Sequence, residues 1–132
     1  MEDKRLDRLF DYTKFHIGIY VSTGGALVTL IGLAAAKAEE GAYIAKLVGS
    51  PTALAISFFL MVVAGMAGGV IASSSTECKS YEDLWAQPQG PFGLRIVTGR
   101  IWAAIEHAAF WMSALAFSYS ILSAAAVRHW LF

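Results

Sequence analysis

Three long stretches of this sequence carry almost no charged residues. They cover residues 15–36, 52–73 and 101–127, and the third is interrupted only by Glu106 and His107. Because an α-helix rises about 1.5 Å per residue, each of the first two stretches makes a helix about 33 Å long, enough to cross a hydrocarbon core of about 30 Å. We therefore expect an all-α integral membrane protein, a single membrane domain over residues 1–132 in which three transmembrane helices form one bundle.

The composition supports this class and argues against several others. Hydrophobic residues make up 57% of the chain and charged residues 15%, against about 45–50% and about 25% in soluble domains. Ten basic and ten acidic residues leave no net charge, so we expect no nucleic-acid partner. A single cysteine, Cys78, cannot form an intrachain disulfide or a redox pair. Because the sequence has no phosphate-binding glycine motif or nucleophile elbow, we expect a protein that is not an enzyme and has no cofactor or metal.

The distribution of lysine and arginine predicts the orientation in the membrane. The first stretch is longer than the apolar core of a signal peptide and follows a segment of balanced charge, which favours a retained span. With three spans, the N-terminal segment and loop 74–100 share a side, and that side holds seven of the ten lysines and arginines. The positive-inside rule therefore places the N-terminus and loop 74–100 in the cytoplasm. We expect the cell's inner membrane as the location.

The segments between the spans contain shorter helical patterns. In residues 3–13, apolar residues recur at helical spacing with charged residues between them, which predicts an amphipathic helix. This segment runs directly into the first span. Residues 38–49 are too short to span, and form either a surface helix or an extension of the first span. In loop 74–100, Ser80 and Asp83 resemble a capping box, which predicts a short interfacial helix that ends before Pro88.

Small residues mark the faces through which helices pack in a bilayer. Each span has one such face at steps of three and four, typical of a left-handed helix crossing. We expect these faces to meet inside one compact bundle. In the alternative interpretation, the second span's broad face, with its GxxxG pair, serves both the bundle and a neighbouring subunit. The predicted packing residues are Gly18, Ser22, Gly25 and Gly32 in the first span and Gly65 and Gly69 in the second.

Glu106 is the candidate functional residue, because a carboxylate is costly in a bilayer and is expected to face protein or water. It lies on the small face of the third span, with Ser113 and Ser120 one and two heptads further on. Lys14 is the predicted partner, and Asp11 on the same face of the first span allows a carboxylate pair instead. Glu106 is then either a clamp between helices or, with the serines, part of a hydrated path.

Two histidines raise the question of a b-type haem, which needs two such ligands on different helices. His16 and His107 lie near the same ends of their spans. Each is roughly 150–160° from the small face of its span at 100° per residue, so both are expected to point outward and to be weak haem ligands.

These features lead to three functional hypotheses. The first is a small membrane protein that acts by helix packing, as an accessory or scaffold subunit of a membrane complex or as a homo-oligomer. The second is a small oligomeric channel in which Glu106 lines a hydrated path. The third, weaker hypothesis is a membrane anchor subunit that carries a b-type haem.

Overall fold

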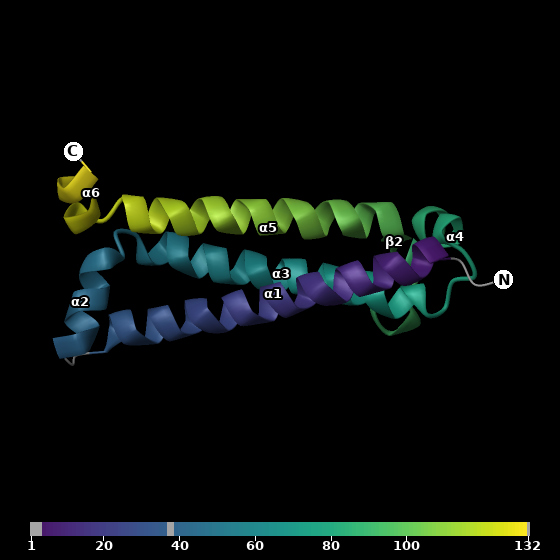
Figure 1. Cartoon of the computed structure of the whole chain (residues 1–132), viewed down its shortest axis with the longest axis horizontal. Coiled ribbons are helices and arrows are strands. Elements are labelled where there is room, and N and C mark those ends of the chain that lie inside the picture. Colours follow the sequence, from purple (N-terminus) through teal and green to yellow (C-terminus); the bar gives the residue numbers. More distant parts are fainter. Residues whose placement is uncertain (1–3, 37–38, 132) are drawn as a thin grey trace.

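Figure 1 shows the computed structural model of the chain, in which three long helices lie side by side with short elements at both ends. The structure describes residues 4–36 and 39–131. The central helix α3 packs against both α1 and α5. The helical class expected from the sequence is confirmed. The elements in chain order are α1 (Lys4–Ala35), α2 (Glu39–Leu47), α3 (Pro51–Ser75), α4 (Tyr81–Ala86), β1 (Pro88–Gln89), the 3₁₀ helix η1 (Pro91–Gly93), β2 (Val97–Thr98), α5 (Gly99–Leu122) and α6 (Ala125–Leu131).

Two of the helices, α1 and α3, are long and apolar enough to cross a membrane. The third long helix, α5, has 24 residues but is not among the candidate spans found in the described residues. Arg100, Glu106 and His107 lower its hydropathy. The structure thus supports two of the three expected spans by length and composition.

The bundle interior combines an apolar core, which includes Leu27, Leu54 and Met61, with several polar side chains, and large apolar side chains also cover the outside. The buried residues of α5 are Gly99, Glu106, Ala109, Ser113 and Ser120. The exposed side chains of the same helix include Trp111, Leu115 and Leu122, and those of α3 include Phe59 and Met66. Helices that face water instead carry polar and charged side chains on their outer face.

One end of the bundle is closed by the connection between α2 and α3. Of the predicted segment 38–49, Glu39–Leu47 form α2, a helix separate from α1, and residue 38 lies outside the described residues. Ser50 caps α3, accepting a hydrogen bond from the Ala53 amide, and Pro51 occupies the first turn. The Gly49 amide donates to the Ser120 carbonyl at 2.8 Å.

The same connection ends α5 earlier than the sequence predicts. The expected span ran to residue 127, whereas α5 ends at Leu122 and Ser123 is its C-cap. A Cβ at Gly49 would lie 2.2 Å from the Ala124 backbone nitrogen, so the two chain segments cross in close contact. This crossing and the Gly49 hydrogen bond divide the predicted third span into α5 and α6.

The other end of the bundle holds the N-terminal part of α1 and the α4 region (Figure 1). The predicted helix cap is confirmed, since Ser80 accepts a hydrogen bond from the Asp83 amide at 3.1 Å. Strands β1 and β2 then form a two-residue antiparallel pair that the sequence did not predict. Leu6 of α1 packs in a cluster with Ile71 and Leu84, so the predicted amphipathic start of α1 contacts protein.

Candidate functional site

The Glu106 carboxyl group lies inside the bundle, in contact with α1 and α3. Its residue is only 2% exposed. The Tyr20 hydroxyl of α1 donates a hydrogen bond to Oε1 of Glu106 at 2.8 Å. On α3, a Cβ at Gly68 would lie 3.4 Å from the same oxygen, so only a small residue fits there without a shift. Glu106 therefore joins all three long helices at one level.

His16 approaches the same carboxyl group from α1. Its Nδ1 lies 3.9 Å from Oε1 of Glu106, beyond hydrogen-bond distance. This nitrogen is buried and has no hydrogen-bond partner among the described residues. The Tyr12 ring and the imidazole form a T-shaped pair with ring centroids 4.0 Å apart, and Tyr20 stacks on the imidazole at 5.9 Å. His16 is thus part of an aromatic cluster around Glu106.

His107 lies on the exposed side of this cluster. Its Nδ1 is 2.8 Å from the Ala103 carbonyl, one turn earlier in α5. The rings of His16 and His107 are 6.3 Å apart. The prediction that both histidines point outward is therefore wrong for His16, because the small face of α1 does not face the bundle.

The geometry gives little support to haem ligation at this pair. A bis-histidine haem needs the porphyrin plane between the two imidazoles. The contacts of His16 with Tyr12, Tyr20 and Glu106 occupy its surroundings with protein groups. Among the described residues, no group of three or more His, Cys, Asp or Glu side chains could hold a metal ion.

Lys14 does not pair with Glu106 in the structure. The Lys14 and Asp11 side chains are exposed and line a shallow hollow on the outside of α1 together with Gly18 and Ser22. The predicted Lys14 contact is thus corrected to Tyr20, and the alternative carboxylate pair of Asp11 with Glu106 does not form. The reason is that Tyr20, not Lys14, lies on the inward face of α1.

Ser113 and Ser120 follow Glu106 along α5 at seven-residue steps, and both are buried, as this spacing predicts. The Ser113 hydroxyl donates to the Ser57 carbonyl at 2.7 Å and lies 2.9 Å from the Ser57 hydroxyl. The Ser120 hydroxyl donates to the Ser50 carbonyl at 2.8 Å. These bonds tie α5 to α3 and its cap, so both hydroxyls already have protein partners.

The small-residue faces of α3 and α1 have opposite placements. On α3, Gly65 faces the bundle, and a Cβ there would lie 3.7 Å from Cβ of Tyr20. Gly69 faces open space beside the loop that follows α4. On α1, a Cβ at Gly18, Gly25 or Gly32 would meet nothing within 4 Å, and Ser22 is exposed. The predicted inward orientation of this α1 face is therefore wrong.

The inward face of α1 carries Leu6, Thr13, Tyr20 and Leu27 at seven-residue spacing, together with Gly24. Large Tyr20 and Ile17 side chains fill the room above Gly65 and Gly68 of α3. Tyr20 and Gly68 were not predicted from the sequence as members of the site, and His16 was predicted only as a weak haem ligand. The seven-residue spacing of Thr13, Tyr20 and Leu27 is a sequence signal for the inward face of α1. This spacing is as regular as that of the small residues on the opposite face.

Cys78 lies outside the long helices, near the end of α3. Its thiol is half-buried and accepts a weak hydrogen bond from the Gln89 amide at 3.5 Å. Burial raises the pKa of this thiol, and the nearby carboxylates of Asp83 and Glu77 raise it further. The structure thus gives no support to an activated thiolate at this position.

Comparisons with family models, curated proteins and solved structures gave no significant match to the chain. The class of protein therefore rests on the fold and on the site. These describe a helical bundle with two candidate membrane spans and one internal carboxyl group bonded to a tyrosine.

Proposed function

We propose that the protein is a small integral membrane protein in which α1, α3 and α5 all cross the bilayer. It acts without catalysis, as a scaffold that assembles from copies of itself through the outer face of α1. The distribution of side chains supports membrane insertion, because large apolar residues cover the outside and the carboxyl group of Glu106 lies inside. The excess of lysine and arginine at the N-terminal end supports a cytoplasmic N-terminus and the inner membrane as location.

One observation carries the assembly proposal: the regular small-residue face of α1 has no partner among the described residues. Gly18, Gly25 and Gly32 all face open space. Tyr20, on the inward side, is about 160° from Gly18 at 100° per residue, so the two faces are nearly opposite. Glycines cost helix stability, but a close backbone approach by a second helix in lipid offsets that cost.

The charges at one end of this face favour a second copy as the partner. Asp11 and Lys14 are exposed at the N-terminal end of the small-residue face. Two copies inserted in the same direction are related by a two-fold axis along the membrane normal, and their α1 helices then run parallel. Lys14 of each copy lies beside Asp11 of the other in that arrangement, so the same surface is complementary to itself.

Glu106 acts in this proposal as a clamp between helices within one copy. Its burial and its bond to Tyr20 favour the clamp over the channel, which requires the carboxyl group to face a hydrated path. Ser113 and Ser120 support the same choice, since their hydroxyls are bonded to α3 and its cap. Ion flux through liposomes that contain the protein would favour the channel instead.

The experiment is a mass measurement of the protein in mild detergent. We expect a dimer or higher oligomer for the natural chain and a folded monomer for Gly25→Leu, because Leu blocks the close approach of two α1 helices. Ala26→Leu is the matched control, because Ala26 is exposed on the same helix but lies about 100° from Gly25. A natural chain that is monomeric at all concentrations would contradict self-assembly and favour an accessory subunit of another membrane complex.

A further inference from the structure

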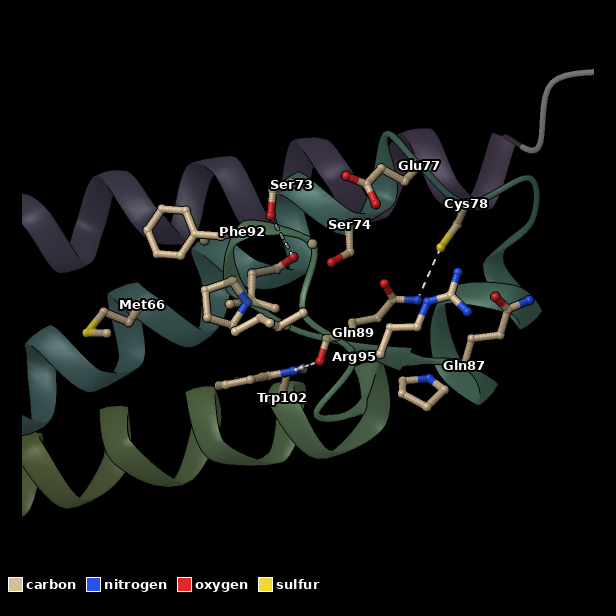
Figure 2. Close-up of a pocket in the computed structure, with 17 residues that line it drawn as sticks. Met66, Ser73, Ser74, Glu77, Cys78, Gln87, Gln89, Phe92, Arg95 and Trp102 are labelled. Carbon is tan, nitrogen blue, oxygen red and sulfur yellow. Dashed lines mark hydrogen bonds between the residues drawn. The ribbon is translucent and has the colours of Figure 1, made fainter.

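A cavity of about 640 Å³ opens between α3, the start of α5 and the loop that joins β1 to β2 (Figure 2). Gly69 and Val70 of α3 and Trp102 of α5 contribute to its wall. Because a Cβ at Gly69 would meet nothing within 4 Å, the cavity extends to the α3 backbone. Its volume is in the range of about 300–1,000 Å³ that is usual for small-molecule sites.

The cavity is apolar at one end and polar at the other. Met66 and Phe92 are at the apolar end, and both side chains are exposed (Figure 2). Glu77, Gln87 and Arg95 lie towards the other end, near Cys78 (Figure 2). The Met66 end lies further along α3 towards the middle of the bundle, so a molecule in this cavity would have its apolar part towards the bilayer core.

The loop that forms the outer wall is held in place by specific contacts. The Trp102 indole nitrogen donates to the Gln89 carbonyl at 2.9 Å, and the Ile96 amide donates to the same oxygen at 3.2 Å. Phe92 has a φ of 57°, a left-handed conformation that is unusual for a non-glycine residue, and its side chain is completely exposed. Such strain persists only where the surroundings fix it, and it is concentrated at functional sites.

Two opposite charges at the polar end lack a side-chain partner within the part of the chain that the structure describes. Neither the Glu77 carboxylate nor the Arg95 guanidinium has a side-chain hydrogen bond or ion pair with any residue in the described ranges, 4–36 and 39–131. An arginine fork matches a phosphate, and a carboxylate accepts hydrogen bonds from a primary ammonium group. A molecule with both groups on a short polar head and an apolar tail would match the cavity along its whole length.

We propose that this cavity binds a phospholipid with a phosphoethanolamine headgroup. The phosphate contacts Arg95, the ammonium group contacts Glu77, and one acyl chain passes between Phe92 and Met66 into the bilayer. A choline headgroup cannot donate a hydrogen bond to Glu77, because its quaternary ammonium has no N–H, so we expect it to bind more weakly. This inference rests on the membrane insertion proposed above, but not on assembly through α1.

The test is native mass spectrometry of the full chain, released from detergent that contains equal amounts of dioleoyl phosphatidylethanolamine, phosphatidylcholine and phosphatidylglycerol. We expect one retained phosphatidylethanolamine molecule per chain. Arg95→Gln and Glu77→Gln should each weaken its binding about tenfold or more, because each removes a charge-assisted hydrogen bond. Equal retention of the three lipids, or a preference for phosphatidylglycerol, would overturn the proposal.

Gly69→Leu provides an independent variant that fills the cavity from its wall. It should abolish phosphatidylethanolamine retention, while Ala55→Leu, at an exposed position of α3 outside the cavity, should leave it unchanged. Alkaline carbonate extraction of membranes separates the two proposals. Release of the protein by carbonate would overturn membrane insertion, whereas a carbonate-resistant protein without selective lipid retention would overturn only the lipid site.

Discussion

The Tyr20 hydroxyl of α1 donates a 2.8 Å hydrogen bond to Oε1 of Glu106 on α5, at the level where Gly68 of α3 approaches the same carboxyl group. The bond links the first and third long helices of the chain across the central one. It also explains why α1 turns a large aromatic residue inward and leaves Gly18, Gly25 and Gly32 outside.

Tyr20→Phe tests this bond directly. The variant keeps the ring and removes the donor, so a buried carboxyl oxygen loses its partner. We expect a loss of about 1–3 kcal/mol in unfolding free energy, measured by thermal or SDS unfolding in detergent. Tyr119→Phe, at an exposed position of α5, is the matched control. Equal stability of the two variants would show that the bond contributes nothing.

A double-variant cycle distinguishes Tyr20 from Lys14 as the partner of Glu106. Lys14 is exposed, so Lys14→Met should not change the unfolding free energy of the monomer, and it should not rescue Glu106→Gln. Tyr20→Phe and Glu106→Gln should instead be non-additive, because residues in one hydrogen bond show coupling energies of about 0.5–3 kcal/mol. Rescue of Glu106→Gln by Lys14→Met would instead support the Lys14–Glu106 pair that the sequence predicted.

Gly49→Ala tests the crossing that ends α5. The new Cβ would lie 2.2 Å from the Ala124 nitrogen and 2.3 Å from the Ser123 carbonyl carbon, and both are backbone atoms. We expect a loss of about 1–3 kcal/mol or more in unfolding free energy. Gly69→Ala meets nothing within 4 Å and should be neutral or slightly stabilising. If the two variants melt at the same temperature, the crossing is not formed as described.

The Cys78 thiol gives a prediction about pH. Its pKa is raised in the folded protein by burial and by the carboxylates of Asp83 and Glu77. The folded state therefore keeps its proton at a pH where the unfolded chain loses it, so this thiol's contribution to stability falls as pH rises above the ordinary thiol pKa. Alkylation by iodoacetamide should be slow at neutral pH and increase only in alkaline solution.

Asp83→Asn removes one of the charges that raise the pKa of Cys78 and should shift the alkylation profile to lower pH. The neighbouring cap is retained, because it uses the Asp83 amide rather than the side chain. An unchanged profile would mean that the Asp83 carboxylate does not influence the thiol.

The sequence predicted those parts of the fold that depend on local pattern. Charge-free length located α1 and α3, and Ser80 with Asp83 located the start of α4. The burial of Glu106, Ser113 and Ser120 followed from heptad spacing on α5 and from the cost of exposing polar groups to lipid. These inferences need only one helix at a time.

The features that the sequence could not predict depend on two helices at once. The α1 helix has two regular faces, and which one turns inward depends on whether Tyr20 fits above Gly65 and can reach Glu106. The end of α5 at Leu122 depends on Gly49 crossing beside Ala124, far away in sequence. The periodicity of a single helix therefore predicts neither which face of α1 turns inward nor where α5 ends.

The most direct test of the account is disulfide cross-linking between copies in native membranes. In a Cys78→Ser background, a cysteine at Gly25 lies on the small-residue face of α1, and a cysteine at Ala26 lies beside it. We expect a covalent dimer for Gly25→Cys under mild oxidation and little or none for Ala26→Cys. Equal cross-linking of both variants, or none at Gly25→Cys, would contradict assembly through this face of α1.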